Sequence, residues 1–296
     1  MKKEISVMTA VKGLIVGGSM TIPGVSGGTT ALILGIYYDL IHAINHFRKE
    51  FKKSALLLAV FCAGAGLGIV GLSYVMKFAL QHFELPTTYL FIGAILGGVP
   101  LLVRESKIRR DDTKGIVLGV LFGIIGVAIV LALERIPQAS SEFGAHLSPT
   151  VLLMQLVTGI IIAVALVLPG ISTSHMLLIL GMYETTITAA KNPFHNIGYL
   201  LSLVIATVVG IFLITGVLEK AMTKAPQVTY FVIIGFVLGS IKDILDEVSS
   251  PRGFEIAVCA LAVAVGYCAI RLFTKMGVAK EETSADVDIT DGAASE

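Results

Sequence analysis

The hydrophobic positions along the chain gather into ten apolar segments separated by short polar stretches. About 20 predominantly apolar residues, wound as a helix, cross the roughly 30 Å hydrocarbon core of a bilayer. Most of the ten segments are close to that length. They cover residues 5–22, 25–44, 54–80, 87–103, 115–134, 150–168, 171–190, 196–218, 228–245 and 253–273. The pattern therefore predicts an all-α polytopic membrane protein.

One stretch of the sequence occurs twice in the chain, as an internal repeat. Residues 16–41, VGGSMTIPGVSGGTTALILGIYYDLI, return as residues 163–187, AVALVLPGISTSHMLLILGMYETTI, displaced by 146 positions, the difference between 169 and 23. Aligned without a gap, Pro23, Gly24, Ser26, Leu32, Ile33, Leu34, Gly35, Tyr37 and Ile41 meet Pro169, Gly170, Ser172, Leu178, Ile179, Leu180, Gly181, Tyr183 and Ile187. The sequence therefore predicts two repeats of about five segments each, residues 1–140 and 141–275.

Each copy contains a Pro-Gly pair, Pro23-Gly24 and Pro169-Gly170, that we expect to break a helix. Proline supplies no backbone N–H and glycine adopts angles that other residues avoid, so the preceding helix ends there. Ser26 or Thr29 can cap the helix that follows. The first N–H groups of that helix have no partner within it and carry partial positive charge. We therefore expect each break to be suited to an anion.

The two repeats are predicted to lie in opposite orientations. Residues 13–22 span only about 15 Å as a helix, against a hydrocarbon core of about 30 Å, which favours a re-entrant hairpin. A unit of five segments crosses the membrane an odd number of times, so the second unit is inverted, as in many secondary transporters. The two breaks should then meet near the membrane midplane. Seventeen of the 22 Lys and Arg residues fall on the face with both termini, which predicts cytoplasmic termini.

Composition supports the membrane assignment. Hydrophobic residues make up 55% of the chain and charged residues 15%, and the mean hydropathy is +0.88, whereas soluble domains carry about 25% charged residues. Residues 276–296 hold six acidic residues and one lysine, which predicts a disordered acidic cytoplasmic tail. The three cysteines lack metal-ligand spacing. We expect no metal, no cofactor and no nucleic-acid partner.

The breaks provide candidate ligands for a phosphate group. These are the backbone N–H groups of Gly27, Gly28, Thr173 and Ser174, and the hydroxyls of Ser26, Thr29, Thr30, Ser172 and Ser174. Lys12, eleven residues before Pro23, is a candidate for the positive charge. Two other interpretations stay open: glycine and serine also permit close helix packing in membranes, and a lysine near a helix end can extend to the interface.

Three ionisable residues near the breaks are candidates for coupling to protons or sodium ions. Asp39 and Glu184 follow the repeated helix at neighbouring positions, and His175 replaces Thr29 in the second copy. Ionisable groups in a membrane segment are costly and commonly functional. Asp39 and Glu184 can alternatively mark helix ends at the water interface, and His175 can be a packed histidine. The acidic pair Asp243 and Glu247 is predicted to lie in a late loop.

At these motifs the sequence resembles the PopT-type membrane family, regarded as translocases of undecaprenyl phosphate. The resemblance rests on KGLIVGGSMTIPGVSGGTTALILGIYYDLI and PGISTSHMLLILGMY, and the duplication extends it over most of the chain. The sequence departs from the family pattern at Thr173-Ser174-His175. The resemblance implies a protein of the bacterial cytoplasmic membrane that returns the spent lipid carrier from the outer to the inner leaflet, with membrane lipids as its surroundings.

Two rival functions remain open at this point. Membrane undecaprenyl pyrophosphate phosphatase also has inverted repeats and a Pro-Gly-x-Ser motif, but there an arginine follows the serine and a pair of glutamates accompanies it. Here Gly27 follows Ser26 and Thr173 follows Ser172, so neither break contains arginine. A carrier or channel for a soluble anion needs the same hydrogen-bond donors as a lipid phosphate.

Overall fold

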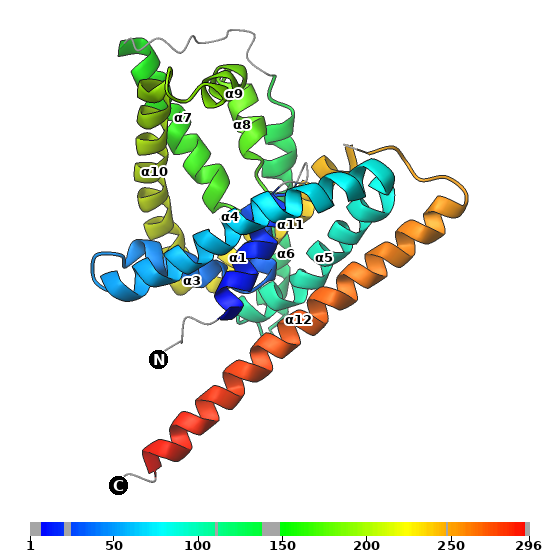
Figure 1. The fold of residues 1–296 in the computed structure, drawn as a ribbon. Coiled ribbons are helices and arrows are strands. Elements are labelled where there is room, and N and C mark those ends of the chain that lie inside the picture. The colour runs from blue at the N-terminus through cyan, green and yellow to red at the C-terminus, as the bar shows by residue number, and fades with distance from the viewer. Residues whose placement is uncertain (1–6, 21–24, 110–111, 138–148, 247, 294–296) are drawn as a thin grey trace.

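The structure, a computed structural model, describes residues 7–20, 25–109, 112–137, 149–246 and 248–293, with side chains described as far as Lys275 (Figure 1). Within these ranges the chain forms helices and no strand. The helices are α1 Val7–Ser19, α2 Gly27–Ile33, α3 Tyr37–Asn45, α4 Phe51–His82, α5 Glu84–Glu105, α6 Thr113–Glu134, α7 Pro149–Val167, α8 Thr173–Ile179, α9 Tyr183–Lys191, α10 Ile197–Lys224, α11 Pro226–Asp246 and α12 Phe254–Ala293.

In the described part of the chain, seven helices are long and apolar enough to cross a membrane: α4, α5, α6, α7, α10, α11 and the first part of α12, Phe254–Lys275. Each begins and ends close to an apolar segment of the sequence. The prediction of an all-helical polytopic membrane protein is thus confirmed. α12 continues as a helix through residues 276–293, for which the sequence predicts a disordered tail. That segment contains no proline to stop the helix.

The segment after each break is two short helices rather than the single helix that the sequence predicts. α2 and α3 follow the first break, and α8 and α9 follow the second at positions shifted by the same 146 residues. The second interruption falls at Gly35 and Gly181, whose φ angles are +67° and +65°. In each copy the glycine N–H and the next residue's N–H bond to carbonyls of the preceding helix. This is a Schellman helix end, which glycine favours.

Equivalent helices make equivalent contacts in the two repeats. α1 packs along α4 as α7 packs along α10, and α5 packs along α12 as α11 packs along α6. The last helix of each repeat therefore lies on the other repeat, and α12 runs beside α5 in Figure 1. These paired contacts agree with a duplicated chain. The inverted orientation and the re-entrant path of the breaks stay predictions.

Small residues bring the first pair of helices together. A Cβ atom at Gly13 or Gly17 of α1 would lie within 2.4 Å of a carbonyl oxygen of α4, and one at Gly64 or Gly68 would lie within 2.3 Å of a carbonyl oxygen of α1. The helix backbones are therefore in direct contact, as at Gly-xxx-Gly crossings in membranes. α7 and α10 also approach closely at Gly159, where a Cβ would lie 2.5 Å from the Cβ of Ala206.

The largest core cluster surrounds the helices after the first break. Leu32 and Ile33 of α2 are buried together with Ile92 of α5 and with Ile233 and Val237 of α11. α2 thus lies inside the helix assembly, between helices of both repeats. This position fixes the polar residues at its N-terminus against the second break.

The contact of α1 with α4 predicts that alanine substitutions at two neighbouring glycines change the stability of the protein by different amounts. In Gly68→Ala the new methyl group would lie 2.1 Å from the Leu14 carbonyl oxygen, whereas a Cβ at Gly71 would have nothing within 4 Å. We expect Gly68→Ala to destabilise the protein by about 1–3 kcal/mol, since overpacking forces backbones apart. Gly71→Ala is the matched control and should be neutral. Thermal unfolding in detergent measures both, and equal midpoints would contradict the close crossing.

Candidate functional site

The two breaks contact each other through a hydrogen bond. The backbone N–H of Gly170 in the second break donates to Oγ1 of Thr29 in α2 at 3.0 Å. Thr29 is 2% exposed, so this bond is shielded from solvent. Gly170 has a φ of +81°, and a Cβ there would lie 2.3 Å from the carbonyl oxygen of Phe236. Both conformation and space therefore require glycine at this position.

A second contact ties the first repeat to the end of α7. The Tyr37 hydroxyl donates a hydrogen bond to the carbonyl oxygen of Val167, the last residue of α7. That carbonyl has no partner inside its own helix because the helix ends there. Gly28 also lies close, since a Cβ there would be 3.3 Å from the Leu166 oxygen. Residues of α2 and α3 therefore pack against the C-terminal end of α7, next to the second break.

The two serines of the repeated motif have the same backbone role and different side-chain roles. Ser26 and Ser172 are the N-cap residues of α2 and α8, with φ of −80° in both. Ser172 Oγ accepts the His175 N–H at 3.3 Å, whereas Ser26 makes no capping hydrogen bond. Thr30 is engaged by Ser19 of α1, with 2.8 Å between their hydroxyl oxygens. Ser26 thus has a hydroxyl that helix capping does not use.

The helices that begin at the breaks are shorter than the sequence predicts. α2 and α8 have seven residues each, because Gly35 and Gly181 end them after two turns. A short helix aligns few peptide dipoles, so its N-terminus attracts an anion less than a full helix would. Anion binding at the breaks would therefore depend mainly on local N–H groups, hydroxyls and a nearby positive charge.

The second break borders a small cavity with acidic walls. Ser172 and His175 line it together with Glu134 of α6 and Asp243 of α11. Its space for the centres of water molecules is about 10 Å³, the room of about one water. Among the described residues, buried His175 Nε2 and Glu134 Oε1 have no hydrogen-bond partner. Residues of the first motif do not line this cavity, so it is not the two-sided phosphate site that the sequence predicts.

Asp243 corrects one sequence prediction. It lies within α11 and faces Glu134, not in a late loop, while Glu247 lies outside the described residues. Lys242 binds Glu134 Oε2 at 3.1 Å and also pairs with Asp246. Sequence reasoning missed Glu134 because it ends an apolar segment far from either motif. Carboxylates beside Ser172 repel a phosphate and attract a cation.

The remaining predicted residues do not line this cavity. Lys12 in α1 is half-buried, and Asp39 is half-buried in the first turn of α3. Glu184 is exposed in the first turn of α9, and Ser174 is exposed in α8. Thr173 begins α8, Gly27 and Gly28 begin α2, and Pro169 is buried. Pro23 and Gly24 lie outside the described residues.

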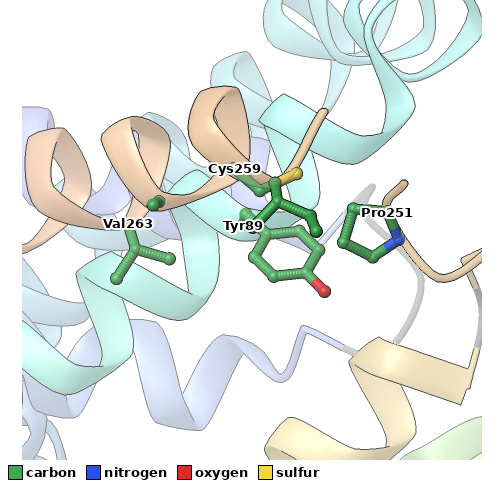
Figure 2. A pocket seen from close by; sticks show the side chains of 6 residues that line it. Tyr89, Pro251, Cys259 and Val263 are labelled. Carbon is green, nitrogen blue, oxygen red and sulfur yellow. The ribbon is translucent and has the colours of Figure 1, made fainter. Parts of the chain in front are cut away.

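A larger hollow opens at the seam between α5 and α12. Its lining is mainly apolar, its volume is about 550 Å³, and it is bounded by Tyr89, Pro251, Ile256, Cys259, Ala260 and Val263. Figure 2 shows the Tyr89 ring beneath the first turns of α12, between Pro251 and Val263. Such a lining suits hydrocarbon rather than a phosphate group.

The family model that matches the chain and two of its relatives are described as transporters of the same kind of lipid phosphate. The model of the VCA0040-like family, described as undecaprenyl phosphate translocase-like, matches residues 16–249. A polyprenyl-phosphate transporter of Staphylococcus aureus is 32% identical over 236 residues, 78% of this chain and 83% of that protein. A polyprenyl-phosphate transporter of Vibrio cholerae is 28% identical over 251 residues, covering 80% and 76%. The zinc transport system membrane protein TroC of Treponema pallidum is 25% identical over 227 residues, covering 64% and 73%. No solved structure matches.

The helices and the paired breaks define a polytopic membrane protein of the transporter class. Among its described residues it has seven long apolar helices and two interruptions that contact each other, and transporters of repeated design place their binding sites at such interruptions. The chain belongs to the VCA0040-like, undecaprenyl phosphate translocase-like family.

The bond between the breaks can be tested at Thr29. Thr29→Val keeps the shape of the side chain and removes the acceptor, which leaves the Gly170 N–H buried and unpaired. An unsatisfied buried donor costs about 1–3 kcal/mol, so we expect a lower unfolding midpoint. Thr29→Ser keeps the hydroxyl and is the control. Equal stability of the valine and serine variants would show that the bond contributes little.

Proposed function

We propose that the protein moves undecaprenyl phosphate from the outer to the inner leaflet of the bacterial cytoplasmic membrane, with both termini on the cytoplasmic side. Family membership supports the cargo, since relatives of 32% and 28% identity are named polyprenyl-phosphate transporters. The observation that carries the proposal is the Gly170–Thr29 hydrogen bond. It joins interruptions from both halves of the chain, and inward transport would return the spent carrier for envelope synthesis.

The headgroup is proposed to bind at the first break. Its donors are the Ser26 hydroxyl, which capping does not use, and the N–H groups of Gly27 and Gly28 in the first turn of α2. Lys12 of α1 is proposed to supply the positive charge that two helical turns do not. Ser172, Thr173 and Ser174 are proposed as donors from the second break once the small cavity there has opened.

The isoprenoid chain requires a sideways route. A lipid headgroup can cross inside the protein only if the hydrocarbon tail stays in the bilayer, because burying the tail in a polar path forfeits its apolar contacts. The hollow between α5 and α12 presents an apolar lining at such a seam. We propose that a tail can lie there during part of the cycle.

Inward movement requires an energy source. A phosphate headgroup carries about 1.5–2 negative charges at neutral pH. Moving one charge against 100 mV costs about 2.3 kcal/mol, roughly a 40-fold ratio between leaflets. Proton or sodium entry can offset this cost. Asp39 and Glu184 remain candidates, but His175 with Glu134 and Asp243 forms a half-buried group at a break. We therefore place cation coupling first at the second break.

Reconstituted transport distinguishes the proposal from its rivals. Purified protein in liposomes should move a fluorescent polyprenyl phosphate between leaflets, and an excess of inorganic phosphate should not abolish the movement. A phosphatase would instead release phosphate from undecaprenyl pyrophosphate. A soluble-anion carrier would accumulate labelled phosphate inside the vesicles. Either of these results without lipid movement would overturn the proposed function.

Substitutions of Ser26 and Ser172 are expected to affect transport and stability differently. Ser26→Ala should lower transport about tenfold or more at unchanged stability, because Ser26 makes no capping bond. Ser172→Ala should also cost about 1 kcal/mol of stability, the usual value of a lost N-cap. Initial transport rates and thermal unfolding measure the two effects. Normal transport by the double variant would reduce the motif to a packing device.

The proposed coupling site predicts loss of gradient dependence without loss of binding. In Asp243→Asn or Glu134→Gln, an inward proton or sodium gradient should no longer accelerate import, whereas exchange at zero gradient should continue. Glu84→Gln is the control, because Glu84 is exposed in the first turn of α5 and does not line the cavity. Uncoupling by Asp39→Asn or Glu184→Gln alone would move the coupling site to the helix starts instead.

A further inference from the structure

A cluster of metal-capable side chains lies between α3 and α10, away from the second break. Glu219 is buried in α10, and its Oε1 lies 2.5 Å from His42 Nδ1 and 3.6 Å from His46 Nδ1. One ligand atom from each of the three side chains can be chosen so that all lie within 4.8 Å of one another. The sequence pattern does not reveal this cluster, because Glu219 joins the histidines only through the packing of α10 on α3.

The two histidines have the spacing of a helical metal site. His42 and His46 are four residues apart at the end of α3, so both side chains lie on one face. Their rings are stacked with centroids 4.1 Å apart. Pairs of histidines at this spacing on a helix, completed by a carboxylate from another helix, bind zinc in protein sites.

The carboxylate of Glu219 is held in position by a third contact. Asn45 Nδ2 donates to Glu219 Oε2, which leaves Oε1 directed at the histidines. Gly216, one turn earlier on α10, makes room for this amide, since a Cβ there would lie 3.2 Å from Asn45 Oδ1. Asn45 is thus a positioning residue of the kind that orients metal ligands.

The cluster is accessible to an ion from one side. Glu219 has 8% of its side chain exposed, while His42 and His46 have 39% and 30% exposed. A buried carboxylate is costly unless it is paired. Three protein ligands and an exposed side would leave one coordination position for water, as in open zinc sites.

We propose that His42, His46 and Glu219 bind a divalent first-row transition metal ion, such as Zn²⁺, with Asn45 orienting the carboxylate. The site departs from the sequence-based expectation of no metal. It joins α3 of the first repeat to α10 of the second, so a bound ion links the two halves of the protein. The ion would replace the hydrogen bond between His42 and Glu219 by two coordination bonds, with a small rotation of the side chains.

Metal binding by the purified full-length protein tests the proposal without a transport assay. After EDTA treatment and reloading, elemental analysis should find one Zn²⁺ per chain. His46→Ala and Glu219→Gln should each weaken Zn²⁺ binding at least tenfold, and Zn²⁺ should raise the unfolding midpoint of the wild type but not of these two variants. His195→Ala removes an exposed histidine elsewhere and is the matched control.

Cobalt gives a second measurement on the unmodified protein. Co²⁺ bound by two imidazoles and a carboxylate should produce visible absorption bands at one equivalent, which Zn²⁺ then displaces. Because this signal is read from the wild type, a variant that fails to fold does not remove the test. Absence of stoichiometric Zn²⁺ or Co²⁺ binding would overturn the site. Binding of equal affinity in folded Glu219→Gln would overturn it as well.

Discussion

The structure depends on one crowded backbone position, Gly170. Its N–H bonds to Thr29 of the first repeat, its φ lies in the left-handed region, and the Phe236 carbonyl of α11 leaves no space for a side chain. Three elements from the two halves of the chain therefore meet at a residue that cannot be substituted without strain. Any movement that opens the second break must separate these contacts together, which makes the opening a concerted event rather than a local one.

The exchange of final helices makes the two repeats interdependent. α6 packs along α11 and α12 along α5, so the last helix of each repeat packs on the other repeat. This exchange brings Glu134 of the first repeat to Asp243 of the second and builds the cavity at His175 from both halves. The packing of α3 on α10 brings Glu219 to His42 in the same way. The polar clusters thus lie where the repeats meet.

The sequence predicts the long helices well because a membrane-spanning helix needs only length and apolar composition. It also predicts that the two breaks are equivalent, since the motif itself is repeated. The interruptions at Gly35 and Gly181 were missed, although both copies carry that glycine before a tyrosine-containing stretch. The clusters at Glu134 and Glu219 were not predictable from local pattern, because each depends on which helices exchange partners. The boundaries of the repeats and the membrane orientation stay predictions.

The duplicated breaks have diverged in charge, and this divergence matters for the proposed cycle. Thr29 accepts the bond from Gly170, whereas the equivalent His175 keeps a buried Nε2 without a partner among the described residues. The cavity beside His175 has acidic walls, and a carboxylate about 4 Å from a phosphate charge costs about 4 kcal/mol at an effective dielectric constant of 20. On the proposed function, the headgroup can extend from the first break to the second only after a cation has neutralised Asp243, because Lys242 already pairs with Glu134. Charge repulsion alone would then require the cation to enter before the headgroup moves to the second break. The coupling of cation and headgroup movement therefore follows from two features: the carboxylates at the second break and the hydrogen-bond donors at the first.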